Sequence, residues 1–466
     1  MIYGEPVEPI GLGPVPMIYI HIPFCHRKCT YCAFYSKPIA LKNSSALTHS
    51  SVSKADSSPN LGEQPEILPA SVPASDRGSH SSPKLGEQPE ILPASVPASD
   101  RGSHSSPKLG EVPEGRRSVS RYVDALCREL VMRRHTMPAS VRTVYFGGGT
   151  PSILTIPQLA QIIDTLRAHY DLSALEECTL EANPEDLTPE YLARLQALGF
   201  FNRISIGVQS LQDDELRLIG RRHTAAQAVG AVHDAVAAGF DNVSIDLIYG
   251  IPSQSEESWR DTLRQVAALP VTHLSAYALT VEPGTILEKQ IGQGRVPAVD
   301  DDQAVGHYKT LLAWAAEQGF RQYEISNFAR EGYRSRHNSR YWDRTPYLGV
   351  GAAAHSFDGE YRRWNVADVQ QYCSLLETGH VPHDEEQLTL RDAHNEYLMT
   401  ALRTVEGIDK SLVPRPFYKS LQSKIGKYLS ASLVEDTGTH YRPTAEGLLQ
   451  ADGIAAELFE CEDVKM

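Results

Sequence analysis

Six short apolar segments, separated by helical patterns, constrain the fold of this 466-residue chain more than any other feature. The expected strands are Met17–Ile22, Val141–Phe146, Cys178–Ala182, Arg203–Val208, Val243–Ile248 and His273–Ala278. Strands that alternate with helices form a mainly parallel sheet, so the pattern predicts an α/β fold with a full or a partial barrel. A full barrel needs two more strand–helix units, and residues 279–345 supply at most one.

The helices between these strands are expected from apolar residues at helical spacing. One of them is well punctuated, because Thr188 is a suitable cap, Pro189 suits the first turn and Gly199 can end the helix. The others are expected near 118–135, around Leu159–Leu166, at 224–238 and near 256–268.

The tail at 381–466 has a different pattern. Helical stretches at 389–403 and 417–431 precede a hairpin pattern at Leu433–Arg442, and a last helix is expected at 444–459. This order predicts a winged-helix-like α+β module. The tail holds 9 Lys and Arg against 15 Asp and Glu, which is the wrong balance for contact with phosphates.

Charge and hydropathy exclude several classes of protein. The net charge of −14 argues against nucleic acid as a partner. No run of eighteen apolar residues predicts a membrane span. Residues 1–16 lack the basic start and apolar core of a signal peptide, so we expect a cytoplasmic protein with an N-terminal extension before Met17.

A near-identical repeat interrupts the chain after the first strand. Residues 81–104 repeat residues 57–80 with one change, Asn60 to Lys84, and a third copy fades after Glu111. The copies consist mainly of Ser, Pro, Gly and charged residues, which bury too little apolar surface to offset the entropy of ordering. The sequence therefore predicts a disordered insertion at 37–116, with a linear partner-binding motif as the less favoured interpretation.

Three cysteines form a compact metal-binding pattern after the first strand. Cys25, Cys29 and Cys32 have the spacing C-x3-C-x2-C, and the other four cysteines stand alone. Protein-bound iron–sulfur clusters normally take four cysteines, so three ligands predict a 4Fe–4S cluster with one open iron. Zinc is the less favoured alternative, because zinc fingers usually pair such a unit with a second pair of ligands.

The segment Tyr19-Ile-His-Ile-Pro-Phe-Cys25, with the three cysteines, resembles the radical S-adenosylmethionine (SAM) superfamily. Within it, the chain is similar to the branch of oxygen-independent coproporphyrinogen III dehydrogenases and the heme chaperones related to them. The resemblance implies a partial six-unit (β/α)6 barrel and SAM bound to the open iron. We therefore divide the chain into 1–16, the barrel at 17–36 and 117–345, the insertion at 37–116, a connecting segment at 346–380 and the module at 381–466.

Residues near the ends of successive strands match the SAM site of this family. Side chains from several parallel strands meet at the carboxyl edge of the sheet, and together they are a stronger signal than any one alone. Glycines after the second strand leave carbonyls free to accept hydrogen bonds from the SAM amine. By resemblance, the SAM contacts are Tyr19, Tyr31, Gly148, Gly149, Thr150, Glu181, Gln209, Arg221, Asp246 and Thr280.

Three features separate this chain from the dehydrogenases. By resemblance to the family, those enzymes carry the motif C-x3-C-x2-C-x-C, whereas here Phe34 stands at the position of the last cysteine. They also have a longer N-terminal region, whereas only eighteen residues precede Tyr19 in this sequence. The segment His337-Asn-Ser-Arg340-Tyr-Trp342 matches an H-N-x-x-Y-W motif associated with the heme chaperones. A histidine can ligate heme iron and an arginine can pair with a propionate, although other histidines such as His355 are rivals.

Two functions remain open from the sequence. The favoured one is a heme chaperone that transfers heme to acceptor hemoproteins, with respiratory enzymes as the family expectation and peripheral membrane contact as an option. The alternative is a coproporphyrinogen III dehydrogenase that decarboxylates propionates through a SAM-derived radical.

Overall fold

A large mixed sheet forms the centre of the computed structural model, which describes residues 17–38, 114–136 and 140–461. Its strands are β1 Met17–Ile22, β4 Thr143–Gly148, β5 Glu177–Ala182, β6 Arg203–Gln209, β7 Val243–Tyr249, β8 His273–Ala278, β9 Arg321–Glu324, β10 Asn327–Ala329, β11 Tyr347–Val350, β12 His355–Phe357, β13 Tyr361–Asn365 and β14 His383–Gln387. The order is β14-β13-β12-β11-β1-β4-β5-β6-β7-β8-β10-β9. Strands from β11 to β8 run parallel, and both ends of the sheet are extended by antiparallel strands.

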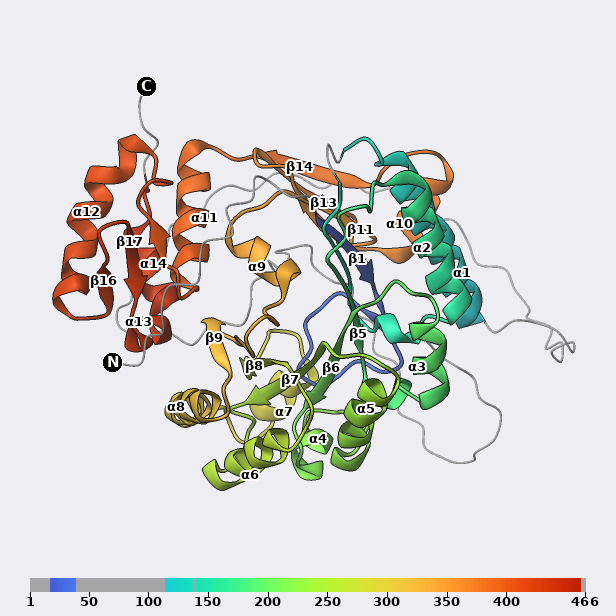
Figure 1. Ribbon diagram of the computed structural model, residues 1–466, viewed down its shortest axis with the longest axis horizontal. Coiled ribbons are helices and arrows are strands. Elements are labelled where there is room, and N and C mark those ends of the chain that lie inside the picture. Colours follow the sequence, from blue (N-terminus) through green and yellow to red (C-terminus); the bar gives the residue numbers. More distant parts are fainter. Residues whose placement is uncertain (1–16, 39–113, 137–139, 462–466) are drawn as a thin grey trace, which may run out of the picture.

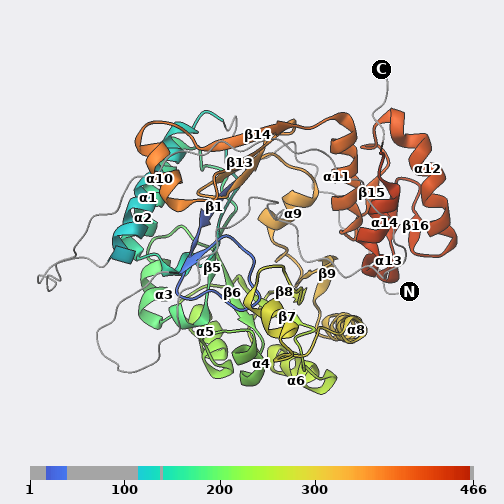
Figure 2. The same ribbon diagram turned by 180° about the vertical axis from the view of Figure 1, so that it is seen from behind.

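Helices cover one face of this sheet, and the sheet curves around its other face (Figures 1 and 2). The helices of the barrel part are α1 Glu114–Met132, α2 Ile156–His169, α3 Pro189–Gln196, α4 Asp213–Leu218, α5 Ala225–Ala237, α6 Glu256–Ala267, α7 Ile286–Gly292, α8 Asp301–Glu317, α9 Arg336–Trp342 and α10 Val369–Glu377. The largest apolar core lies between the sheet and the helices outside it. Figure 1 shows α9 on the inner, concave side.

The alternation of residues along each strand explains these two faces. In β1, Ile18, Ile20 and Ile22 join the apolar core, whereas Tyr19 and His21 lie on the opposite face. The register carries this division across the sheet, because Tyr19 pairs with Tyr145 in β4. The concave face is consequently polar, and its members include Thr143, Tyr145, Glu177, Thr179, Glu181, Arg203, Ser205, Ser244, Asp246, His273 and Ser275.

The C-terminal residues form a separate module with its own apolar core. Its elements are α11 Leu390–Leu402, β15 Ile408–Asp409, α12 Arg415–Ser430, β16 Val434–Asp436, β17 His440–Pro443, α13 Ala445–Leu449 and α14 Ala451–Leu458. The three strands form a small sheet in the order β15-β17-β16. Helices beside a hairpin agree with the predicted winged-helix-like α+β arrangement.

Helix α11 joins the two edges of the large sheet. It begins just after the edge strand β14. Just beyond its other end, the Arg403 carbonyl accepts a hydrogen bond from the Ile325 N–H (3.0 Å). The Val405 N–H donates to the carbonyl of Tyr323 in the opposite edge strand β9 (3.3 Å). In between, Glu396 pairs with Arg362 of β13 at 2.7 Å. Figure 2 shows α11 between these edges.

The predicted α/β fold is confirmed, and all six expected strands are present in their expected order. The final helix is split at Gln450 into α13 and α14. Most of the predicted insertion lies outside the described residues. At its margins, Lys37–Pro38 form β3, which pairs with β2 Phe24–Cys25, and α1 begins at Glu114. Within the described parts of the chain, no helix is long and apolar enough to cross a membrane.

Candidate cofactor site at the carboxyl ends of the strands

The loop after β1 carries the three cysteines, all of which are partly exposed. Thr30 anchors this loop, because its N–H donates to the carbonyl of Ile219 (3.2 Å) and its carbonyl accepts from the N–H of Leu287 at the start of α7 (2.9 Å). Tyr31 packs against the small apolar cluster around these two residues. The loop therefore has a fixed position over the carboxyl ends of the parallel strands.

Two polar side chains, one just after β4 and one just after α4, donate to the cysteine sulfurs. The Thr150 hydroxyl donates to Cys25 Sγ at 3.4 Å, and Arg221 Nη1 donates to Cys29 Sγ at 3.5 Å. Asn183 connects both donors, since its amide group donates to Thr150 Oγ1 (3.2 Å) and accepts from Arg221 Nη2 (2.6 Å). Donors directed at sulfur stabilise the thiolate form that a metal needs.

The donor set fits an iron–sulfur group. Burial raises the pKa of the Cys32 thiol to about 11 and also raises that of Cys25, so bound metal is needed to keep these thiolates at neutral pH. Three cysteines on one loop, with hydroxyl and guanidinium donors at sulfur, suit a larger cluster.

The glycine motif brings β4 close to the cysteine loop. Gly148 has φ +107°, and a Cβ there would lie 2.5 Å from Cε1 of His21. Gly149 donates its N–H to the Ile22 carbonyl at 2.9 Å, and a Cβ there would lie 2.6 Å from the Phe24 carbonyl oxygen. Gly148 therefore requires glycine for its left-handed backbone, and Gly149 requires it for the close approach of the neighbouring backbone.

Glu181 lies next to this motif on the concave face. Its carboxylate accepts hydrogen bonds from the Tyr145 hydroxyl (2.7 Å) and from the Gly148 N–H (3.1 Å). Burial raises the pKa of Glu181 to about 7. A carboxylate in this environment gains most from a cationic partner, such as an amine, that lowers its pKa again.

The raised pKa of Glu181 predicts a pH-dependent contribution to stability. The folded protein holds this proton up to about pH 7, whereas the unfolded chain releases it near 4.5, so ionisation disfavours folding as the pH rises. At 1.36 kcal/mol per unit, we expect the wild type to lose about 3 kcal/mol relative to Glu181→Gln between about pH 4 and 8. Urea unfolding of both proteins across this range measures the difference.

The exposed substitution Glu190→Gln controls for the general effect of replacing a glutamate. A difference between wild type and Glu181→Gln that does not change with pH would contradict the raised pKa.

The remaining predicted SAM contacts lie at the same edge of the sheet. The hydroxyl of Ser205 donates to Asp246 at 3.3 Å, and burial raises the pKa of that aspartate. Gln209 ends β6 in a left-handed conformation with φ +68°, which is strained for a side chain other than glycine. Thr280 follows the end of β8 and is partly exposed.

The structure places His337 on the concave face but near the amino ends of β4 and β5, away from the carboxyl edge of the sheet. It is fully buried, its ring nitrogens are hydrogen-bonded to Thr143 Oγ1 (2.8 Å) and the Tyr341 hydroxyl (3.0 Å), and it stacks on Tyr145 with centroids 5.0 Å apart. Burial lowers the pKa of His337 to about 3. The ring is therefore neutral, and it can ligate iron only by giving up one of these two bonds.

Arg340 and Phe34 are both accessible. Arg340 is partly exposed, and its guanidinium forms no hydrogen bond or ion pair with any residue that the structure describes. Phe34 is 58% exposed on the cysteine loop. The rival His355 is partly exposed on the concave side of β12, beside Trp364, with the ring centroids 6.4 Å apart and the planes tilted.

Two further residues of this region are absent from the sequence prediction. Asn183 connects Thr150 and Arg221, and it stands two residues after the predicted site residue Glu181 at a strand end. The strand-end rule could have found it. Tyr145 hydrogen-bonds Glu181 and stacks on His337, and the only signal for it is the alternation that places it beside Tyr19.

Comparison with known proteins agrees with this geometry. The model of the radical SAM superfamily matches residues 102–266, and that of the HemN C-terminal domain matches residues 388–449. The solved structure of coproporphyrinogen III oxidase (HemN) from Escherichia coli, described as a radical SAM enzyme, superposes with a TM-score of 0.70 over 96% of this chain and 90% of that chain. At 21% sequence identity, this match speaks for the fold alone.

Sequence relatives define the family more narrowly. The heme chaperone HemW of Mycobacterium tuberculosis (strain ATCC 25618 / H37Rv) is 30% identical over 97% of this chain and 98% of its own length. The heme chaperone HemW of Bacillus subtilis (strain 168) is 34% identical over 65% of this chain and 80% of its own length. The chain therefore belongs to the HemW family of the radical SAM superfamily.

Proposed function

We propose that this protein is a heme chaperone, which binds heme in the cytoplasm and transfers it to acceptor hemoproteins such as respiratory enzymes. The observation that carries this proposal is the similarity to heme chaperones named HemW over nearly the full length of both chains. The position of α9 supports it, because this helix carries the H-N-x-x-Y-W motif on the concave face of the sheet, where His337 packs on Tyr145 and contacts the first residues of β4 and β5. Membership in the radical SAM superfamily implies a 4Fe–4S cluster and SAM.

Cys25, Cys29 and Cys32 would hold the cluster, and its open iron would bind SAM. The SAM residues would then include the Gly148–Thr150 turn and Glu181 at the strand ends, and Arg221, which follows α4 and lies next to Cys29. Arg221 supplies a cation for a carboxylate, and Glu181 supplies an anion for an amine. Their separate positions suit the two charged groups of an amino acid.

Heme titration followed by the Soret band tests the function. We expect wild-type protein to bind heme, and His337→Ala to weaken this binding by removing the predicted iron ligand of α9. Arg340→Met should weaken heme binding less, because it removes a propionate partner but leaves the iron ligand. Unfolding curves of both variants show whether α9 is still folded.

Failure of the wild type to bind heme would contradict the proposed function. Loss of binding in His355→Ala, with His337→Ala unaffected, would overturn only the assignment of the ligand.

Coproporphyrinogen III dehydrogenase remains the second candidate, since the strand-end residues that match the SAM site are all present and the fold is that of HemN. Phe34 argues against it, because it replaces a cysteine of the dehydrogenase pattern. We expect no conversion of coproporphyrinogen III when reconstituted protein is incubated anaerobically with SAM and a reductant. Chromatographic detection of protoporphyrinogen at a catalytic rate would favour the enzyme over the chaperone.

A further inference from the structure

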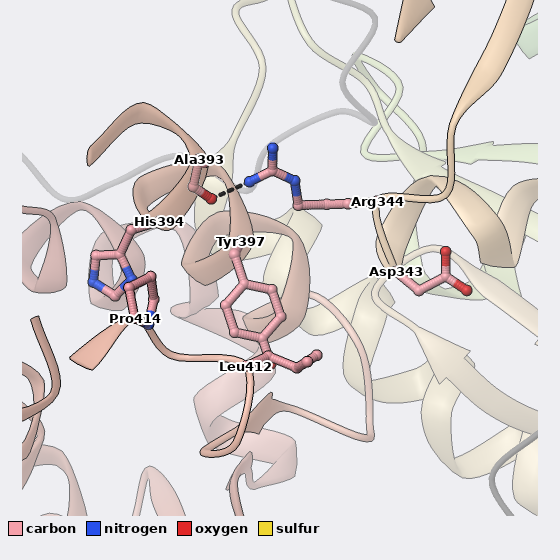
Figure 3. Close-up of a pocket in the computed structure, with 7 residues that line it drawn as sticks. All are labelled: Asp343, Arg344, Ala393, His394, Tyr397, Leu412 and Pro414. Carbon is pink, nitrogen blue, oxygen red and sulfur yellow. Dashed lines mark hydrogen bonds between the residues drawn. The ribbon is translucent and has the colours of Figure 1, made fainter. Parts of the chain in front are cut away.

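A cavity of about 220 Å³ lies where the C-terminal module meets the barrel. Its walls come from three segments, which are the turn after α9, helix α11 and the loop before α12 (Figure 3). The residues that line it are Asp343, Arg344, Ala393, His394, Tyr397, Leu412 and Pro414. The first segment follows Trp342 directly, so the H-N-x-x-Y-W helix positions one wall of the cavity.

His394 is the unusual residue of this cavity. Its side chain is 1% exposed, and neither ring nitrogen has a hydrogen-bond partner among the described residues. Phe417 stacks on one face of the ring with centroids 4.7 Å apart, which fixes the plane of the imidazole but leaves its edge free. Buried polar groups nearly always have a partner, so an imidazole with two unpaired nitrogens indicates a ligand that supplies one.

The polar groups around His394 favour a ligand with a carboxylate, and the apolar lining of the cavity favours one in which this carboxylate is attached to a ring. A neutral imidazole has one N–H donor, and burial lowers the pKa of His394, which keeps the ring neutral. Arg344 lines the cavity; it donates to the Ala393 carbonyl and shares the carboxylate of Glu396 with Arg362, at 3.4 and 2.7 Å. Glu460, whose carboxylate interacts with His394, is paired with Lys424 at 3.1 Å, so Arg344 is the cation that a carboxylate in the cavity would meet. Figure 3 shows the carboxylate of Asp343 directed away from His394 and Tyr397.

The volume of the cavity limits how much of a heme molecule it can enclose. Pockets that enclose a whole drug-sized ligand measure about 300–1,000 Å³, so this cavity admits only one edge of a tetrapyrrole. Tyr397, Leu412 and Pro414 provide apolar surface for that edge, and Leu412 is 62% exposed at the rim.

On these grounds, and resting on the proposed function, we propose that the cavity binds one propionate edge of heme, with His394 and Arg344 donating to the carboxylate. The rest of the porphyrin, including its iron, then lies outside the cavity. Because the iron is not enclosed, it is accessible to a ligand from α9 or from an acceptor protein.

Heme and its dimethyl ester, in which the propionates cannot accept as carboxylates, distinguish this site from iron ligation. The full-length protein is titrated with each, and the Soret band reports binding. We expect His394→Leu to reduce the preference for heme over the ester by about 10- to 100-fold, which corresponds to losing a hydrogen bond to a charged group. His394→Gln should keep part of the preference because it retains a donor, and the exposed His233→Leu should keep all of it.

A pair of substitutions at the exposed rim provides a test that does not alter the buried residues. Leu412→Glu should weaken binding of heme by repelling its carboxylate, and Leu412→Lys should strengthen it, whereas binding of the ester should change little in either variant. A preference for heme that is equal in His394→Leu and wild type, together with no effect of charge at position 412, would overturn the inference. If the wild type binds neither compound, the proposed function itself fails.

Discussion

Replacing Cys25, Cys29 and Cys32 together with alanine is expected to abolish cluster binding completely. These side chains are the three clustered thiols of the chain, and Thr150 and Arg221 direct hydrogen bonds to two of them. An iron–sulfur cluster has no other set of sulfur ligands to use in the described part of the chain. Anaerobic reconstitution followed by iron and sulfide analysis measures the loss.

The matched control is a variant in which Cys127 and Cys461, two isolated cysteines, are replaced by alanine. It should keep the full iron and sulfide content, because neither residue lies in the cysteine loop. Retention of a wild-type cluster signal in the triple variant would show that the ligand assignment is wrong.

The second large effect is expected on stability, from Glu129→Leu. Glu129 is fully buried in α1, and its carboxylate accepts hydrogen bonds from Arg133 (3.2 Å), the Gly351 N–H (2.9 Å), Asn365 (2.8 Å) and Tyr372 (2.5 Å). Removing it leaves a buried guanidinium and three other donors without this acceptor. Breaking a buried charge pair in this way costs about 3–5 kcal/mol in the free energy of unfolding.

Urea unfolding of the two proteins at neutral pH measures this cost. Glu377→Leu is the matched control, because Glu377 also links α10 to α1, through Arg121, but on the surface (2.7 Å). It should leave stability close to that of the wild type. Equal stability of Glu129→Leu and wild type would show that the network around Glu129 contributes little.

The sequence predicts the parallel strands well, because each combines a continuous apolar face with a helix that follows it. Two of them, Met17–Ile22 and His273–Ala278, have the predicted bounds. Strands β11 to β14 are not predicted, since they are short and pair with neighbours whose positions depend on tertiary contacts. β11, for example, runs parallel to β1, more than 300 residues away in the chain. β15 is missed because two residues carry no periodic signal.

The site follows the same division. Strand-end residues such as Thr150 and Glu181 can be placed near one another from sequence, because parallel strands present their carboxyl ends at one edge. Arg221 follows α4, and only the resemblance to the family placed it at this site. The environment of His337 cannot be predicted from sequence, because its hydrogen bonds to Thr143 and Tyr341 depend on how α9 packs onto β4. Likewise, the lack of a hydrogen-bond partner for the two ring nitrogens of His394 among the described residues follows from how two parts of the chain pack together, so sequence alone could not predict it.

Helix α11 has a mechanical consequence for the open sheet. In a half-open barrel, the distance between the two edge strands could change by twisting of the sheet. Here α11, a helix of 13 residues, connects these two edges. At 1.5 Å per residue, the helix is about 20 Å long and it sets the distance between these edges. The sheet and α11 thus form a closed ring. A change in the distance between the two sheet edges must first break the contact of α11 with β13 or the backbone hydrogen bonds beside β9.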